Sequence, residues 1–461
     1  MIPKYIIRSL FTLLSVVALT LALDSCKIMQ PYSRPAITSE DKLFRDMPTD
    51  SSNMANIRWQ EIFTDKHLDS LINEALSNNL DMKIAMARME KAEAALRQSR
   101  AAFFPTLNLS GSVTLPKNSP SVLTPYQLLG NSSWEADIIG RLRNNKRASF
   151  DLFLKSEASS RLLVTELIAD VANSYYTLLA LDAQLRITEK TVENRISDVN
   201  ILTVMKESDM VTGADVVQSQ ANLLSAKLRI PDLKQRIYET ENSLSILLGR
   251  NPGPIARGTL SEQNISVDLK AGMPAQLLAN RPDVQAAEYQ LRYGYEMTNV
   301  ARKNFYPSLT LTATAGYFTN NLSHLFDPSS FFWNLVGGLT QPVFNQGLNR
   351  QRLASAKADQ EENIAAYKQV VLRSGQEIAD AIHGYQASTE KVMLRKNQIE
   401  YLEKAVDYTM ELLKYTSTTN YLDVLTSEVS LLDAQLNEVN DRLNQLQFII
   451  TLYRSLGGGW K

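Results

Sequence analysis

The stretch ARKNFYPSLTLTATAGY, residues 301–317, changes its periodicity at Pro307. A helical pattern leads up to the proline, and from Ser308 onward apolar and small polar residues alternate with a period of two. This alternation is typical of a β-strand with one apolar and one polar face. The stretch therefore predicts a helix that ends at Pro307, followed directly by a strand.

The same pattern occurs earlier in the chain, as RAAFFPTLNLS at residues 100–110. The offset between the two copies is constant over the matching residues: Asp81 corresponds to Asp283, Arg100 to Arg302 and Pro105 to Pro307. A second match follows further on, where the segment at Asp215 corresponds to the segment at Asp423. The chain is therefore interpreted as a tandem duplication.

The duplication predicts two repeats. The first repeat, residues 59–272, is expected to contain helices over 59–79 and 80–104, a β-hairpin over 106–138, a helical hairpin over 148–248 and a crossover segment. The second repeat, residues 273–461, is expected to contain a short helix over 273–280, a helix that opens at Pro282, a β-hairpin over 308–343, a helical hairpin over 349–456 and a C-terminal tail.

The N-terminus has the pattern of a secretory leader. A basic start precedes an apolar run from Leu10 to Leu23, which is too short for a spanning helix. Residues 1–25 are interpreted as a lipoprotein signal peptide, and residues 26–58 as an extended tether. Cys26, the only cysteine, resembles the acylated first residue of a bacterial lipoprotein, and Lys27 after it favours the outer membrane. A plain secretory leader followed by a spare thiol is the alternative.

The four predicted strands alternate apolar with polar residues and carry aromatic residues near their ends. Strands of this length and pattern are typical of a transmembrane β-barrel, with apolar side chains toward lipid and polar ones toward the lumen. An ordinary half-buried hairpin alternates in the same way. The secretory leader favours the membrane interpretation. The strands are expected over residues 106–115, 128–138, 308–317 and 331–343.

Both repeats also predict helices too long for one globular core. Residues 148–206 would extend ~90 Å at ~1.5 Å per residue. Such helices pack as antiparallel coiled pairs and need further neighbours. Four strands would leave unpaired edges in lipid, so the chain is expected to oligomerise through its sheet. Two copies would give about eight strands and three copies about twelve. The strand count alone is compatible with a dimer or a trimer, while the long helices favour a trimer.

Several motifs of the chain resemble the outer membrane factor family, the TolC-like exit ducts of tripartite efflux pumps. The resemblance is closest to the lipid-anchored efflux lipoprotein branch, called NodT-type, and covers nearly the whole mature chain. The motifs are Tyr32-Ser33-Arg34-Pro35, Trp59 to Phe63, Ala279-Asn280-Arg281-Pro282-Asp283-Val284, Phe305 to Leu309, Gln341-Pro342-Val343-Phe344 and Ser455-Leu456-Gly457-Gly458-Gly459-Trp460.

The resemblance implies an α+β membrane protein that acts as a homotrimer. Its four transmembrane strands would contribute to a 12-stranded β-barrel, continued by a periplasmic α-helical barrel. It would lie in the cell outer membrane, anchored by lipid, and dock with a periplasmic adaptor (membrane fusion) protein and an inner-membrane transporter of the resistance-nodulation-division (RND) type. It would conduct drugs or other toxic small molecules passively, with no enzymatic activity and no cofactor.

The two turns of the helical hairpins are the expected periplasmic gate. Equivalent positions of the two repeats would place six carboxylates per trimer at one level of the duct. Capping of the helix N-termini is the alternative role for these carboxylates. The gate candidates are Asp209, Asp215, Asn420, Tyr421 and Asp423, and the candidates for adaptor docking are Met210, Thr212, Gly213, Thr418 and Thr419.

Composition argues against several other classes of protein. The net charge of −1 does not favour a nucleic-acid surface. The three histidines, His67, His324 and His383, have no metal-ligand spacing, and no phosphate-binding loop or hydrolase motif occurs. We therefore expect no catalytic residue and no metal site. Two alternatives stay open for function: a duct for type I protein secretion, and a structural coiled-coil lipoprotein that is not a channel.

Overall fold

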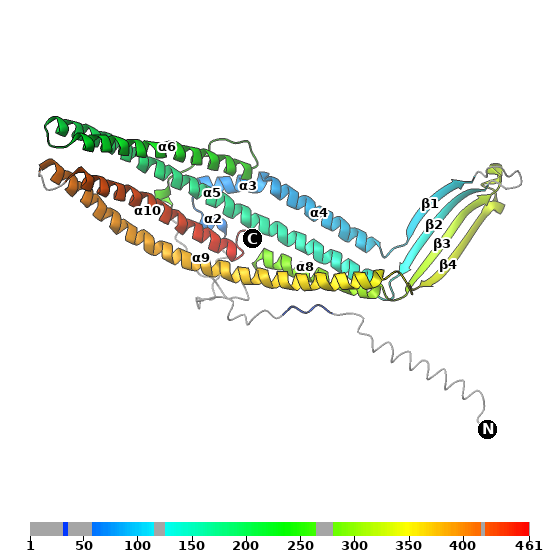
Figure 1. Ribbon diagram of the computed structural model, residues 1–461. Helices are drawn as coiled ribbons and strands as arrows, with labels where there is room; N and C mark the ends of the chain where they lie inside the picture. Colours follow the sequence, from blue (N-terminus) through cyan, green and yellow to red (C-terminus); the bar gives the residue numbers. More distant parts are fainter. Residues whose placement is uncertain (1–30, 36–57, 115–124, 264–279, 416–419, 461) are drawn as a thin grey trace, which may run out of the picture. The chain divides into compact units, whose positions relative to one another are not determined.

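The computed structural model describes residues 31–35, 58–114, 125–263, 280–415 and 420–460 (Figure 1). Cys26 and most of the short helix predicted over 273–280 lie outside these ranges. Among the described residues, no helix combines the length and hydropathy needed to cross a bilayer. The longer elements are α3 (Lys66–Asn78), α4 (Leu80–Ala101), β1 (Thr106–Val113), β2 (Tyr126–Ala136), α5 (Arg141–Glu207), α6 (Gly213–Leu247), α8 (Pro282–Lys303), β3 (Ser308–Thr319), β4 (Phe331–Thr340), α9 (Leu348–Tyr415) and α10 (Tyr421–Ser455); α2 (Trp59–Ile62) and the 3-10 turns Leu260–Glu262, Leu322–His324 and Pro328–Ser330 are short.

The chain divides into two compact units, and each contains parts of both predicted repeats. The first unit comprises the described parts of residues 1–36, 89–156 and 286–368, with the sheet and the adjoining helix segments. The second comprises the described parts of residues 37–88, 157–285 and 369–461, with the helix turns and a hydrophobic core.

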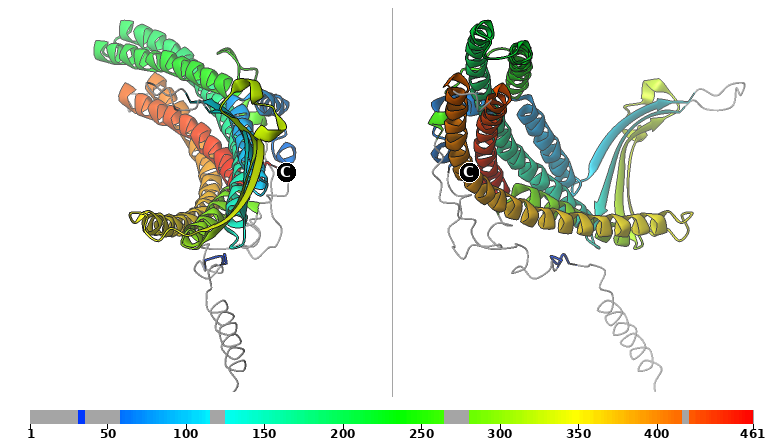
Figure 2. Two further views of the ribbon diagram at one scale, coloured as in Figure 1. Left: turned by 90° about the vertical axis from the view of Figure 1, so that its right-hand side faces the viewer. Right: turned by 60° about the vertical axis from the view of Figure 1, so that its left-hand side comes forward.

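The four strands form one antiparallel sheet in the order β1-β2-β3-β4, and Figure 2 shows it as a curved layer. Residues that pair directly across an antiparallel ladder lie on the same face. Leu109 pairs with Gly130, Gly130 with Ala315, and Ala315 with Trp333. The neighbouring row runs from Asn108 through Asn131 and Thr314 to Asn334.

The register therefore gives the sheet one mainly apolar and one mainly polar face, as the alternation predicts. The apolar face is open in the single chain: Leu107 is 80% exposed, Trp333 71% and Leu339 69%. Burial of such side chains yields about 1.5–3 kcal/mol each, so this face is suited to lipid or a partner surface.

The boundary of the first strand–helix junction differs from the prediction. The helical hairpin was predicted to begin at Ala148, but α5 begins at Arg141. The Asp137 carboxylate accepts hydrogen bonds from the backbone N–H groups of Leu142 (2.9 Å) and Arg143 (3.0 Å). The carboxylate thus satisfies backbone donors that a helix N-terminus leaves free. Because of this cap, α5 starts before the residues in which the apolar helical pattern begins.

Further boundaries also differ: β1 ends at Val113 and β2 spans Tyr126–Ala136. The helix predicted over residues 59–79 consists of α2 and α3, because Asp65 caps a new helix start by accepting from the backbone N–H of His67 at 2.7 Å. The strand predicted to reach residue 343 ends at Thr340. Pro342 follows shortly after, and proline has no N–H for a sheet ladder.

The second unit contains the principal hydrophobic core. Side chains of α2 and α3 pack with the middle of α5 and the end of α10. Phe63 lies 6.4 Å from Tyr453 and 6.5 Å from Tyr176, measured between ring centroids. The buried residues come from both predicted repeats, so this core holds the two repeats together.

Candidate functional site

The turn between α5 and α6 is closed by a capping box. The Asp215 N–H donates to Thr212 Oγ1 at 3.4 Å, while the Thr212 N–H donates to Asp215 Oδ2 at 2.8 Å. Just before it, Asp209 adopts a left-handed conformation with φ 57°, and the Met210 N–H returns to the Met205 carbonyl at 2.9 Å. Both helix ends at this turn are therefore stabilised by local bonds.

The start of α10 repeats this arrangement. The Asp423 N–H donates to Asn420 Oδ1 at 3.2 Å, and the Asn420 N–H donates to Asp423 Oδ2 at 3.3 Å. Asp215 and Asp423 thus occupy equivalent positions, as the duplication predicts, and both serve as reciprocal caps. Capping explains why an acidic residue stands there, independently of any role in a pore.

A small hydrophobic cluster, called here the tip cluster, gathers side chains from the last turns of α5 and α9 and the first turns of α6 and α10. Tyr421 is only 4% exposed and Val424 is fully buried. Because the cluster draws on four helices, it joins the helical hairpin of one repeat to that of the other. Its buried members are Leu202 and Met205 of α5, Val216 of α6, Leu413 of α9, and Tyr421, Val424 and Leu425 of α10.

The remaining predicted site residues divide by location. Met210 is 57% exposed, and Asp209, Thr212, Gly213, Asn420 and Asp423 are also exposed. Thr418 and Thr419 lie outside the described residues, as does Cys26. Tyr421 is the exception among the gate candidates, because its side chain is part of the tip cluster.

The Arg-Pro-Asp-Val motif joins the start of α8 to the C-terminus. Arg281 is 6% exposed, and its guanidinium donates to the Ser455 carbonyl oxygen at 2.7 Å. It also forms ion pairs with Asp283 at 2.6 Å and with Glu377 at 2.9 Å. Burial lowers the pKa of Arg281, but the two carboxylates outweigh it and the pKa is raised overall. The arginine therefore stays charged where helices of the second unit meet.

The C-terminal glycine-rich motif lies directly against this arginine motif. The Trp460 indole N–H donates to the Asn280 carbonyl oxygen at 3.3 Å, and the Arg161 guanidinium lies 4.8 Å from the Trp460 ring centroid. Gly457, with φ 81°, passes so close to Asn280 that a Cβ atom would lie 2.7 Å from its carbonyl oxygen. The two most specific sequence motifs thus form one structural contact.

The N-terminal Tyr-Ser-Arg-Pro motif is held by α8 in the first unit. Arg34 donates to the Glu288 carboxylate at 2.5 and 3.2 Å, and the Tyr32 hydroxyl donates to it at 3.2 Å. The Tyr32 ring also meets Tyr295 edge-on at 5.4 Å. This part of the predicted tether therefore has a specific binding place on the helix.

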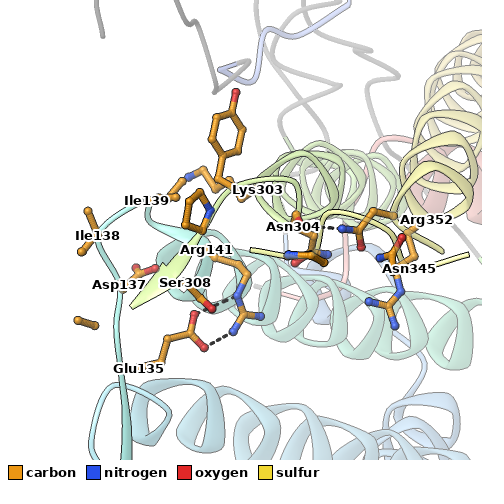
Figure 3. Close-up of a pocket in the computed structure, with 15 residues that line it drawn as sticks. Glu135, Asp137, Ile138, Ile139, Arg141, Lys303, Asn304, Ser308, Asn345 and Arg352 are labelled. Atoms are coloured by element: carbon orange, nitrogen blue, oxygen red, sulfur yellow. Dashed lines mark hydrogen bonds and ion pairs between the residues drawn. The ribbon is translucent and has the colours of Figure 1, made fainter. Parts of the chain in front are cut away.

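A polar pocket of about 320 Å³ lies where β2 and β3 meet the starts of α5 and α9 (Figure 3). Arg141 pairs with Glu135 at 2.6 Å, and the buried Lys303 ammonium donates to the Gly140 carbonyl oxygen at 3.1 Å. Burial lowers the pKa of Lys303. The charged groups largely neutralise one another, so the geometry favours a joint between strands and helices. In the described part of the chain, no group of three or more His, Cys, Asp or Glu side chains forms a metal site.

A comparison with known protein families shows which family has this architecture. The family described as outer membrane efflux protein matches residues 71–250 and 273–458, one segment in each predicted repeat. The chain belongs to this family. Its members are outer membrane efflux proteins, and this chain is an exit duct of the outer membrane.

Curated relatives match along almost their entire length. The chain is 30% identical over 452 residues to the cation efflux system protein CusC of Escherichia coli, covering 96% of this chain and 97% of the relative. It is 28% identical over 464 residues to the toluene efflux pump outer membrane protein TtgC of Pseudomonas putida, covering 97% and 96%. The match to efflux proteins therefore includes both repeats.

Solved structures support the same fold. The outer-membrane channel OprN superimposes with a TM-score of 0.86 at 26% identity, covering 94% of this chain and all of that one. The open state of the MtrE outer membrane channel of Neisseria gonorrhoeae gives a TM-score of 0.84 at 25% identity, covering 95% and 99%. The predicted fold class, strands for a membrane barrel with long helices for a helical barrel, is confirmed.

Proposed function

We propose that three copies of the chain form the gated exit duct of a tripartite efflux pump. The observation that carries the proposal is the sheet, which has one apolar face and two open edges, on β1 and β4. Each backbone group left unpaired in lipid costs several kcal/mol, so the edges require further copies. Three copies would close a barrel of about twelve strands, wide enough for a passage.

The cargo of the duct is proposed to be small molecules. Relatives are named for efflux of toluene, antibiotics and cations, and this range supports a conduit whose selectivity comes from its partners. In this proposal an RND transporter of the inner membrane supplies the energy, a periplasmic adaptor connects the two, and the duct itself performs no catalysis and needs no cofactor.

The gate is proposed at the two helix turns. The half-buried Asp215 and the exposed Asp423 lie at equivalent positions beside the tip cluster, so trimerisation would multiply their carboxylates into a ring. The adaptor would dock on the exposed turn residues Met210, Thr212 and Gly213, together with Thr418 and Thr419.

The leader supports a further element of the proposal, the lipid anchor that defines the NodT-type branch. Cys26 would carry the acyl chains and hold the protein in the outer membrane. Growth with labelled palmitate should label the wild type and leave Cys26→Ser unlabelled. Equal labelling of both proteins would remove the anchor from the proposal without affecting the duct.

Single-channel recording in planar bilayers tests the duct and its gate. Purified wild-type trimer should give small, cation-favouring current steps. Asp423→Asn removes the charge but keeps an oxygen that accepts the cap bond, whereas Asp423→Ala removes both; both should reduce cation selectivity. Glu400→Gln on α9, where the carboxylate is exposed and pairs with Lys404, is the matched control and should leave selectivity unchanged.

The possible results separate the two parts of the proposal. An absence of current steps from a trimeric preparation would overturn the duct. Normal steps whose selectivity in both Asp423 variants equals that of the wild type would keep the duct and refute Asp423 as a gate residue. A loss in Asp423→Ala alone would assign the aspartate to capping.

A further inference from the structure

Two carboxyl groups from different repeats meet close to the tip cluster. Asp198 lies on α5, one turn before Leu202 of the cluster, and Glu428 lies on α10, about two turns after Tyr421. Asp198 is 7% exposed, and the two carboxyl groups lie within hydrogen-bonding reach of each other. A hydrogen bond between two carboxyl groups requires a proton on one of them.

No other hydrogen-bond donor satisfies the two buried carboxyl oxygens in the described part of the chain. Asp198 Oδ2 and Glu428 Oε2 are buried, and neither meets an N–H or O–H donor among the described residues. The guanidinium of the buried Arg195 uses Nη1 to bind the Asn222 carbonyl oxygen of α6 at 2.6 Å. Its buried Nε has no hydrogen-bond partner in the described part of the chain, so it donates to neither carboxyl group.

The charged surroundings of the pair are sparse. On α5, Arg195 favours ionisation of both carboxyl groups, and Lys414 of α9 favours that of Asp198. Tyr421 of α10 is held neutral, because burial raises its pKa. The polar groups that α6 brings to this region are uncharged, Ser219 and Asn222. Lys190 lines the neighbouring cavity of about 160 Å³, into which Glu428 and Arg195 also open.

Burial and the neighbouring carboxyl therefore dominate the protonation of the pair. Burial, followed by the charge of Asp198, raises the pKa of Glu428 to about 8. Burial also raises the pKa of Asp198. Like charges in one buried site cannot both form without cost, so the pair holds one proton at neutral pH and titrates as a unit.

We propose that Asp198 and Glu428 form a proton-dependent latch between α5 and α10. While the two carboxyl groups share one proton, they hold the helices of the two repeats together beside the tip cluster. When the proton leaves, two buried negative charges repel each other, and the contact between α5 and α10 loosens. The small cavity beside Glu428 gives the proton a route to solvent. The role of the latch in opening the duct rests on the gate proposed above, whereas the sharing of the proton does not.

The sign of the pH dependence follows from the direction of the shift. Since the pKa of Glu428 is higher in the folded protein than in an unfolded chain, the stabilisation is complete below the ordinary carboxyl range. It is lost as the pH rises through about 8. The latch should therefore be closed in mildly acidic surroundings and released in alkaline ones.

Infrared difference spectroscopy of the purified trimer tests the shared proton. The wild type should show the C=O stretch of a protonated buried carboxyl that disappears with a midpoint near pH 8. Glu428→Gln should lack this band, because its amide donates to an ionised Asp198. Asp198→Asn should move the midpoint to lower pH. Glu400→Gln, at an exposed site, is the matched control and should behave as the wild type. A wild-type spectrum without the band, or the same band in Glu428→Gln, would overturn the proposal.

Thermal unfolding and conductance test the latch itself. Between mildly acidic and mildly alkaline pH, the unfolding temperature of Glu428→Gln should fall less than that of the wild type, and the wild-type duct should open more often as the pH rises. A titrating band accompanied by identical pH profiles in both proteins would refute the latch. An absence of current at every pH would refute the proposed function, while the spectroscopic and unfolding results would still decide the latch.

Discussion

Replacement of Gly457 by alanine should weaken the contact between the two family motifs. Gly457 has φ 81°, and an added Cβ would lie 2.7 Å from the Asn280 carbonyl oxygen, 2.9 Å from its carbonyl carbon and 3.1 Å from Arg281 Cα. All three neighbours are backbone atoms, so no side chain can rotate away. The backbone around Arg281 would have to move, together with the ion pairs that it makes.

The expected cost has two parts. A left-handed conformation costs an L-residue roughly 1–2 kcal/mol, and overpacking adds roughly 1–3 kcal/mol. Gly347 allows the conformational cost to be measured without the overpacking cost, because it has φ 80° but no heavy atom lies within 4 Å of the added Cβ. Gly347→Ala should therefore carry only the conformational part, and Gly457→Ala should be less stable by about 1–3 kcal/mol more.

Thermal unfolding of the detergent-solubilised trimer, followed by circular dichroism, measures the difference. Asparagine variants sharpen the test, since asparagine tolerates the left-handed region better than alanine. Asparagine should restore much of the stability at position 347 but not at 457, where the Cβ clash remains. Equal unfolding temperatures for Gly347→Ala and Gly457→Ala would refute the reasoning, because the close approach to Asn280 would then have no energetic effect.

Three other predictions concern single side chains. Asp209→Gly should raise the unfolding temperature, because glycine relieves the strain at φ 57° by about 1 kcal/mol; a decrease would show that the aspartate makes a compensating contact. Tyr421→Ala should cost about 3–5 kcal/mol in the same assay and Tyr421→Phe about 1 kcal/mol, and similar costs would argue against a packing role. Burial opposes ionisation of Asp65, but hydrogen bonds from Tyr175 and Gln263 lower its pKa overall, so its stabilisation is present above the ordinary carboxyl range and lost as the pH falls through the lowered pKa. Acid unfolding of Asp65→Asn should lack this component, and an unchanged acid limb would contradict it.

The sequence predicted the elements that depend on local periodicity. The switch at Pro307 located the start of β3 at Ser308, and the alternation of the strands identified the two faces that the ladder register confirms. The helix turns fell where the pattern breaks, and the equivalent aspartates begin their helices in the same way. Period, proline and capping chemistry act over a few residues, so they can be recognised without knowledge of the fold.

Predicted positions were less accurate where a single side chain determines the local structure. Asp137 caps α5 from within residues 128–138, which were predicted to form a strand. Tyr421 was expected at the gate from its place at the turn, yet its side chain is buried beneath it. In both cases the neighbours that determine the role come from the folded arrangement rather than from the adjacent sequence.

Only the tertiary structure decided which distant residues meet. The sequence by itself determined that the chain is duplicated, that each copy turns from helix to strand, and that its motifs are those of an efflux duct. It could not show that Trp460 bonds to Asn280, 180 positions earlier, or that Asp198 and Glu428 share a site between repeats. The physical reason is that such contacts depend on how helices of two repeats pack side by side, and helix periodicity specifies which face is apolar but not which partner covers it.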